Sequence, residues 1–324
     1  MARSRGKGYQ WLESHVKLKW TTAGSSDSPY SDSVYIDTAQ CLSLLNRKLV
    51  RQGQIFRIRN MRFFTNDTSP NATIKVGVIP RTWVSRNSWV KAKALWDKLN
   101  RQVTEDVGRR SIYPKWHDFK VFMDVNHFDE HGDGSTSDVN LLPVDFDDDA
   151  MQTGEWEYSE FSDSGATSNN YYASMMGDHV GSTGAWSLVG IITAYGESRT
   201  YPQIDQTSTG DLVPTALDTG PWARLFGDDD QTQDVISDLE TKNDSPPYSR
   251  VHYIGGTDFD DGTCVGYTRM QTLSQTSGTA TFSVPSFTAP CGLIRIEIDG
   301  ESDTSSMQPV HVQFDVDILS RMDA

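Results

Sequence analysis

Closely spaced aspartates are the residues of this chain best suited to binding an ion. They gather in short runs at positions 145–149, 228–230 and 258–261. Several carboxylate oxygens in so short a stretch are the ligands that a hard cation such as Ca²⁺ prefers. The pattern predicts calcium at subunit interfaces and no other cofactor, with solvated acidic turns as the alternative. The candidate metal ligands are Asp145, Asp147, Asp148, Asp258 and Asp260.

The sequence carries none of the common signatures of nucleophilic catalysis or nucleotide binding. It has no Gly-x-Ser-x-Gly nucleophile elbow and no glycine-rich phosphate loop. Its three cysteines, Cys41, Cys264 and Cys291, form no Cys-x-x-Cys pair that would suggest zinc. Two distant carboxylates could still hydrolyse a glycoside, because the chain holds 44 acidic residues. We therefore expect no catalytic residues and no enzymatic activity, and an enzyme on the same fold is the least favoured alternative.

Basic residues form a second group with a definite chemistry. Lys and Arg neutralise phosphates, and aromatic rings between them stack unpaired bases, so the group predicts sequence-independent binding of single-stranded nucleic acid. The alternative is that these charges form solvated faces and the nearby tryptophans belong to the core, which is the role expected of Trp96. The candidate binding residues are Arg3, Arg5, Lys7, Lys17, Lys19, Arg57, Arg59 and Arg62.

The charges of the chain are divided unevenly along its length. Residues 1–120 hold 22 Lys and Arg against 9 Asp and Glu, whereas residues 121–324 hold 7 against 35. Charge balance reports on partners and solubility rather than on fold. The division suits a shell subunit whose basic part faces nucleic acid and whose acidic part faces water. An ordinary acidic protein, with its basic residues clustered by chance, is the alternative.

Alternating apolar and polar residues predict that β-strands position these groups. Period-two alternation occurs at residues 15–20, 72–79, 119–123, 294–298 and 310–318, and it is typical of half-buried strands. A further strand is predicted from Gln54 to Phe64, with Phe56 and Ile58 on its apolar face. The apolar phase reverses after Asn60, which predicts a one-residue bulge at that position.

Two helices and several long connections complete the predicted elements. The first helix covers residues 88–103, with an apolar stripe at Ala92, Leu95, Trp96, Leu99 and Val103, and the second covers residues 231–242. Long connections at 124–149 and 196–249 are best tolerated by a β-sandwich, whose loops gather at its ends. No apolar run has the length of a membrane span.

Six short stretches carry a resemblance to a known family. They are Trp-His-Asp-Phe-Lys-Val-Phe-Met-Asp at 116–124, Asn-Leu-Leu-Pro-Val-Asp at 140–145, Gly-Glu-Trp at 154–156, Gly-Asp-His-Val-Gly at 177–181, Asn-Asp-Ser-Pro-Pro-Tyr at 243–248 and Ala-Pro-Cys-Gly-Leu-Ile at 289–294. Together they resemble capsid proteins of environmental, largely marine, circular Rep-encoding single-stranded DNA viruses. The resemblance implies an all-β fold, a single jelly-roll β-sandwich whose copies close into a small icosahedral shell around the genome. Many of these relatives carry a long Arg-rich arm, whereas the basic arm here is short.

These observations predict one organisation for the chain. Residues 1–20 form a short basic arm leading into the first strand, and residues 21–324 form the jelly-roll domain with long loops and two short inserted helices. The expected partners are further copies of the chain, packaged single-stranded DNA and an unidentified host receptor, without a membrane. The expected location is the virion, assembled inside the host cell. A glycan-binding, lectin-like or tail-associated β-sandwich is the alternative function.

The expected surfaces of the subunit follow from the same reasoning. Aromatic residues in long loops are favoured between subunits, which places Tyr171, Tyr172 and Trp222 at an interface. The basic candidates are expected on the inner side of the shell and the acidic loops after residue 124 on the outer side. Alternatively, the basic helix around residues 91–101 faces outward and pairs with a neighbour's acidic loop.

Overall fold

The computed structural model describes residues 13–20, 30–65, 72–106, 117–131, 140–154, 156–163, 169–182, 185–197, 254–256, 262–270, 280–300 and 309–323. Several predicted features lie outside these residues. They are the helix at 231–242, the basic residues Arg3, Arg5 and Lys7, the candidate ligands Asp258 and Asp260, and Trp222.

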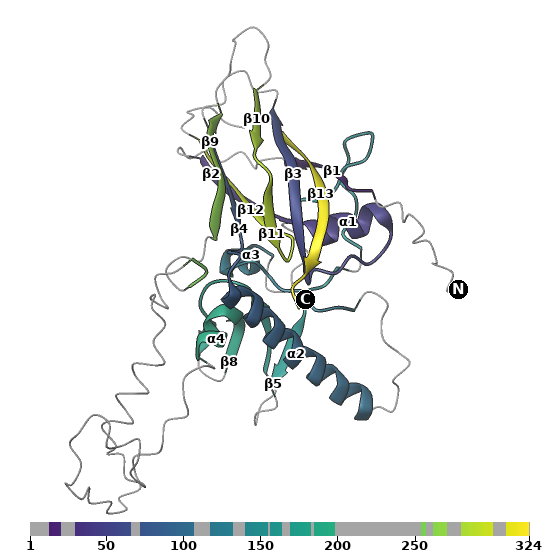
Figure 1. The fold of residues 1–324 in the computed structure, drawn as a ribbon, viewed down its shortest axis with the longest axis vertical. Coiled ribbons are helices and arrows are strands. Elements are labelled where there is room, and N and C mark those ends of the chain that lie inside the picture. The colour runs from purple at the N-terminus through teal and green to yellow at the C-terminus, as the bar shows by residue number, and fades with distance from the viewer. Residues whose placement is uncertain are drawn as a thin grey trace, which may run out of the picture.

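Two antiparallel sheets packed face to face form the upper part of the molecule in Figure 1. Sheet A has the order β1-β13-β3-β10, and β11 also pairs with β3; its strands are β1 (His15–Trp20), β13 (Val310–Arg321), β3 (Gln54–Thr65), β10 (Ala280–Val284) and β11 (Phe287–Pro290). Sheet B has the order β2-β12-β4-β9; its strands are β2 (Tyr30–Asp37), β12 (Leu293–Gly300), β4 (Ala72–Val78) and β9 (Thr263–Met270). The predicted antiparallel β-sandwich is confirmed.

The strands of the sandwich pair in a nested order. The first strand pairs with the last, β1 with β13, and the second pairs with the next to last, β2 with β12. Inside these, β3 pairs with β10 and β11, and β4 pairs with β9. The chain therefore pairs with itself like one long hairpin that has been rolled into two sheets.

Period-two alternation places one side of each strand in the core between the sheets. On β13 the inward residues Val310, Val312, Phe314 and Val316 are at most 4% exposed, and the residues between them are half-buried. The same pattern holds on β1, β4 and β12, so the strands predicted at 15–20, 72–79, 294–298 and 310–318 are confirmed. Burial of these β-branched and aromatic side chains is the main force that holds the sheets together.

The bulge predicted in β3 is present at Asn60. Arg62 lies opposite Gln313 and Arg59 lies opposite Asp315, so two residues of β3 face one residue of β13. Asn60 adopts a left-handed conformation with φ of 53°, which asparagine tolerates better than most residues. The bulge keeps Ile58 and Met61 both on the core side despite the change of phase.

A long insertion between β4 and β9 forms a second layer at one end of the sandwich (Figure 1). Its helices are α2 (Trp83–Asp106), α3 (Val125–Glu130) and α4 (Ile191–Glu197). Its small sheet has the order β5-β6-β8-β7, with β5 (Glu160–Asp163), β6 (Asn169–Ser174), β7 (Val180–Ser182) and β8 (Ala185–Gly190). A hydrophobic cluster that includes Ile79, Trp89, Phe119 and Leu293 joins the insertion to the sandwich.

Helix α2 is longer than the sequence predicted, and three residues of its predicted apolar stripe, Ala92, Trp96 and Leu99, pack in or against the core. It begins at Trp83, where the hydroxyl of Thr82 caps it by accepting a hydrogen bond from the Ser85 N–H at 3.2 Å. Trp89 and Trp96 are 2% and 6% exposed, so the core role expected of Trp96 is confirmed. Leu95 was wrongly assigned to the buried stripe and is 46% exposed, because the buried stripe is centred on the two tryptophans.

The strand predicted at 119–123 is wrong. Phe119, Val121 and Met123 are buried as expected, but Lys120 and Phe122 are only 3% exposed, so both sides of the segment are covered. Two of its N–H groups donate to side chains instead of to a neighbouring strand: Val121 to Gln52 and Lys120 to Ser159. Its only β-type pairing among the described residues is an isolated bridge at Phe122. Alternation alone does not distinguish such a segment from a paired strand.

Helix α1 (Thr38–Asn46), which the sequence analysis missed, is capped by a buried carboxylate. Asp37 accepts hydrogen bonds from the N–H groups of Ala39 and Gln40 and from the side chains of Gln52 and Trp156. Burial nevertheless raises the pKa of Asp37 to about 6. The same carboxylate therefore anchors the start of α1 and the segment around Trp156.

Candidate nucleic-acid interface

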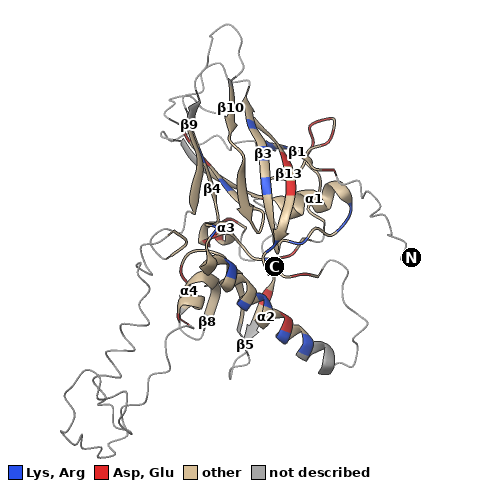
Figure 2. Ribbon diagram, viewed as in Figure 1, with Lys and Arg blue, Asp and Glu red and all other residues tan. Residues whose placement is uncertain are grey.

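The outward face of sheet A brings together five of the eight predicted nucleic-acid-binding residues. Three come from β3 and two from β1, although the two strands are not neighbours in the sequence or in the sheet. They are Lys17, Lys19, Arg57, Arg59 and Arg62. Figure 2 shows basic positions on β3 beside acidic positions on β13.

Strand register explains how these residues come to share one face. Lys17 lies opposite Gln313, and Gln313 lies opposite Arg62, which places the three side chains in one row across the sheet. Period-two alternation sends Val16, Leu18 and their counterparts into the core, so the polar positions point outward. The basic face therefore depends on β13, which lies between the two strands that supply the cations.

Two outward aspartates on β13 balance part of this charge. Arg59 pairs with Asp317 at 2.9 Å, and His15 Nδ1 lies 2.8 Å from Asp315. The hydrogen bond with His15 is the main cause that lowers the pKa of Asp315. Five Lys and Arg against two Asp leave the outward positions 15–19, 57–62 and 311–317 with an excess of positive charge. Exposed ion pairs of this kind are weak, so the cations stay accessible to phosphates.

The remaining cations of this face differ in how they are held. Arg57 Nε donates to the Ser286 hydroxyl at 3.2 Å, and Lys19 pairs with Asp148 at 3.0 Å. Lys17 and Arg62 are both exposed, and each extends from a strand position beside Gln313. These two side chains are the best placed to meet a phosphate without breaking an ion pair.

The acidic loop at residues 145–149 lies at the β1 edge of sheet A. The Val144 N–H donates to the Lys17 carbonyl, which ties the loop to this edge. Asp145 Oδ1 accepts from the N–H groups of Asp147 and Asp149 at 2.9 and 3.0 Å, so this carboxylate stabilises the turn. In the described part of the chain no three His, Cys, Asp or Glu side chains form a group that could hold a metal. Calcium at Asp145, Asp147 and Asp148 stays a prediction.

The two tyrosines predicted at a subunit interface lie on β6 in the insertion. Tyr171 stacks on Phe161 with ring centroids 5.5 Å apart, and Tyr172 contacts Phe122 and Phe128 edge-on or tilted. Both side chains are half-buried within their own chain. Intrachain packing thus covers part of their apolar surface, and a contact with another subunit stays a prediction.

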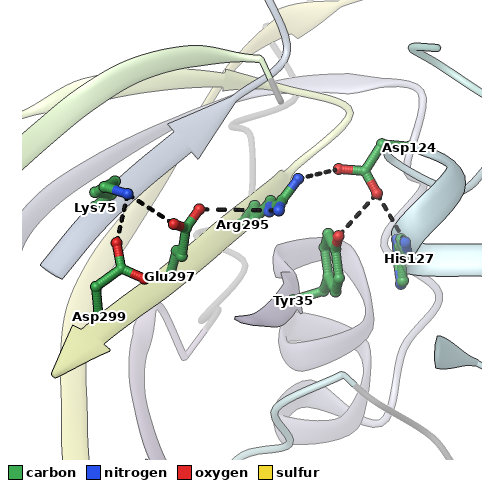
Figure 3. Close-up of polar contacts among 7 residues, drawn as sticks. All are labelled: Tyr35, Lys75, Asp124, His127, Arg295, Glu297 and Asp299. Carbon is green, nitrogen blue, oxygen red and sulfur yellow. Dashed lines mark hydrogen bonds and ion pairs between the residues drawn. The ribbon is translucent and has the colours of Figure 1, made fainter. Parts of the chain in front are cut away.

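A buried polar network joins sheet B to the insertion, and the sequence analysis did not identify it (Figure 3). Asp124 caps α3 through the His127 N–H, accepts from the Tyr35 hydroxyl at 2.8 Å and lies 3.4 Å from Arg295. The His127 ring stacks on Tyr35 with centroids 4.3 Å apart. The only hint in the sequence is an Asp three residues before a His, which is a helix-capping pattern.

The protonation states in this network suit a structural role. His127 Nδ1 accepts from the Met123 N–H, and Nε2 lies 3.0 Å from the amide oxygen of Asn140, so the ring is neutral. Burial lowers the pKa of His127 to about 3 and raises the pKa of Tyr35 far above its ordinary value. Asp124, His127 and Tyr35 bond to one another or to neighbouring groups, which fastens α3 to the outer side of sheet B.

A cavity of about 330 Å³ lies where the start of α2 meets the end of sheet A. Arg81, Arg86 and Arg321 line it, together with apolar side chains such as Ile55. Arg86 donates to the Met322 carbonyl at 3.0 Å, and Arg321 pairs with Asp323 at 2.8 Å. The bond from Arg86 fixes the residue that follows β13 against α2.

Comparisons with protein-family models, with curated proteins and with solved structures find no match to this chain. Among the helices that the structure describes, none combines the length and the apolar character needed to cross a membrane.

Proposed function

We propose that the protein is a capsid subunit that self-assembles into a closed shell around single-stranded DNA. The proposal places the protein in the virion, with assembly inside the host cell, and assigns it a structural rather than a catalytic role. The observation that carries the proposal is the basic outward face of sheet A, on an otherwise strongly acidic chain.

The nested strand pairing supports a jelly roll as the architecture of the subunit. A jelly roll has eight strands in two sheets, formed by two Greek keys. Numbered along the chain and counting β10 with β11 as one, the strands of the sandwich have the orders 1-8-3-6 and 2-7-4-5. Such a domain carries its loops at the ends of the sheets, where they are free to meet neighbouring copies.

The basic face supports contact with packaged nucleic acid. Its cations lie on strands rather than on a mobile arm, so they form a fixed surface that meets phosphates without reading sequence. Only three predicted cations, Arg3, Arg5 and Lys7, precede the first strand, so the five strand positions would supply the larger share of phosphate neutralisation. Packaging a genome requires contacts of this sequence-independent type.

Electron microscopy of the purified full chain tests the assembly. We expect closed particles of uniform diameter in negative stain, together with nucleic acid that nuclease cannot digest until the particles are disrupted. A lectin-like protein would instead give monomers or small oligomers. Protein that stays monomeric over a wide range of concentration, salt and pH would refute the proposal.

A charge-reversed pair of variants tests the DNA-binding face. Lys17→Glu with Arg62→Glu changes two exposed cations of the outward face. We expect weaker binding to single-stranded DNA and a salt dependence whose log–log slope is reduced by about 1.4, since each phosphate contact contributes about 0.7. Lys48→Glu with Arg81→Glu removes the same charge from two exposed positions off this face and serves as the matched control. Equal loss of affinity in both double variants would refute the assignment.

A further inference from the structure

The loop at residues 145–149 presents an apolar side chain in an acidic setting. Phe146 is fully exposed, and it lies between Asp145 on one side and Asp147, Asp148 and Asp149 on the other. Single exposed apolar residues are common on protein surfaces. A phenylalanine that projects from a turn among four carboxylates is unusual, because no residue that the structure describes shields the ring.

The loop holds Phe146 in a defined position. Val144 and Ala150 form a bridge across its base, and the Asp145 N–H donates to the Asp149 carbonyl at 3.0 Å. The Asp145 carboxylate closes the turn from inside, and Asp148 pairs with Lys19 on β1. Because the backbone at Phe146 is already ordered, binding would cost little backbone freedom, which favours its use in recognition.

The outer side of α2 has the opposite character. Trp83 and Val90 are 48% and 37% exposed, Ala94 is also exposed, and the three lie at positions i, i+7 and i+11 along one line of the helix. Trp83 rests edge-on against Tyr195 of α4, which leaves the other part of its ring open. The result is a mainly apolar stripe, interrupted by Asn87, on the solvent side of a helix that already buries a second stripe in the core.

Basic residues flank this apolar stripe on α2. Lys91 and Lys98 are exposed beside it, with Arg86 one turn after Trp83 and Arg101 following in line with Ala94. Figure 2 shows these cations along α2, away from the β1 edge of the sandwich where the acidic loop lies. The two surfaces are complementary in polarity and in charge, and their separation in the fold prevents them from meeting within one chain.

We propose that the Phe146 loop of one copy docks on the outer stripe of α2 in a second copy. Phe146 would pack against Trp83, Val90 and Ala94, while Asp147 and Asp149 face the flanking lysines and arginines. The two sides of this contact differ, so each copy offers one donor and one acceptor surface, an arrangement that generates rings or extended assemblies. The inference rests on the proposed self-assembly and names one of its interfaces.

Two variants, each with one surface broken, test the contact in the full chain. Phe146→Ser removes the aromatic side chain, and Val90→Asp places a carboxylate within the stripe. We expect each variant alone to self-associate at least tenfold more weakly than the unmodified protein in sedimentation velocity. An equimolar mixture is expected to form a 1:1 complex that grows no further, because one intact loop meets one intact helix.

Tyr267→Ser is the matched control, since Tyr267 is 68% exposed on β9 and belongs to neither surface. It should assemble like the unmodified protein, and all three variants should unfold at the same temperature as that protein. If Phe146→Ser builds normal particles, or the mixture forms no complex, the inference is overturned and the proposed function stands. If the unmodified protein forms only oligomers that Phe146→Ser abolishes, the contact stands and the proposed shell fails.

Discussion

The two sheets of the sandwich expose outer faces with different electrostatics. On sheet B, Lys75 bonds to both Glu297 and Asp299, which raises the pKa of Lys75, and Arg295 pairs with buried Asp124 (Figure 3). On sheet A, five cations face two aspartates of β13, and Asp148 of the adjoining loop pairs with Lys19. On sheet B the described cations Lys75 and Arg295 are thus each paired with a carboxylate, whereas on sheet A the described cations outnumber the carboxylates around them.

The comparison also shows how similar residues serve different purposes. Asp124 and Asp317 each pair with an arginine, but Asp124 is wholly buried and the Asp317 side chain is 41% exposed. Removing one member of a buried pair leaves an uncompensated charge, whereas exposed pairs contribute little to stability. Burial, rather than the ion pair itself, decides which face depends on its charges for folding.

The largest expected effect is on the buried side of this comparison. Asp124→Ala leaves Arg295, the Tyr35 hydroxyl and the cap of α3 without their partner. We expect the free energy of unfolding to fall by about 3–5 kcal/mol, measured by urea titration followed by tryptophan fluorescence. A fall below 1 kcal/mol would show that the network does not fasten the insertion to sheet B.

The next effect concerns the pH dependence of stability. Because the folded pKa of Asp37 is raised from 3.8 to about 6, its contribution is present below pH 3.8 and is lost as the pH rises through 6. Across this pH range the free energy of unfolding should fall by on the order of 2–3 kcal/mol. Urea titrations from pH 4 to pH 7 should show this decline in the unmodified protein.

The same titration of Asp37→Asn should lack this decline, although the variant is less stable because its amide faces donors of Gln52 and Trp156. The pKa shift of Asp315 on sheet A has the opposite sign. Its lowered pKa adds stability at neutral pH that is lost only as the pH falls below its ordinary range. Identical pH profiles for the unmodified protein and Asp37→Asn would contradict the assignment.

Removing the acidic residues of sheet A should have a smaller effect, and it should strengthen a property, the affinity for DNA, rather than weaken it. Asp315→Asn with Asp317→Asn removes the two carboxylates from the basic face, so affinity for single-stranded DNA should rise several-fold at low salt. Glu297→Gln with Asp299→Asn makes the same change on sheet B and should leave affinity unchanged. Filter binding at two salt concentrations separates the two outcomes, and equal gains would mean that net charge alone governs binding.

The smallest effect is expected for Asp317→Ala. Its partner Arg59 is 46% exposed, so loss of the pair should change the unfolding free energy by about 0.5 kcal/mol or less. The shift in the urea midpoint of Asp317→Ala is measured and compared with that of Asp124→Ala under the same conditions. Comparable losses in the two variants would remove the distinction between the two faces.

Local patterns in the sequence predicted the parts of this fold that depend on neighbouring residues. Alternation located β1, β4, β12 and β13, and the phase change in β3 located the bulge at Asn60. It failed at residues 119–123, where both sides of the chain are buried, and at Leu95, which is exposed although Ala92, Trp96 and Leu99 of the same predicted stripe pack in or against the core. In both places the tertiary environment decides burial, and periodicity carries no information about it.

Local patterns could likewise predict one part of the candidate interface but not the other. Arg57, Arg59 and Arg62 could be placed on one face from β3 alone, apart from the reversal at Asn60. That Lys17 joins them depends on a pairing between residues about 300 positions apart, which no local pattern encodes. The network around Asp124 was missed because its members come from β2, α3 and β12.

The pairing of β1 with β13 has a consequence for the order of events during synthesis. His15 and Asp315 lie opposite each other, so β1 cannot pair in sheet A until β13 has been synthesised. Contacts of such long sequence separation form slowly and late. A growing chain that lacks β13 cannot set β1 beside β3, so the five cations gather on one face only after residue 321 has been synthesised. If the proposed function holds, a nascent chain without β13 does not offer the complete basic face to nucleic acid.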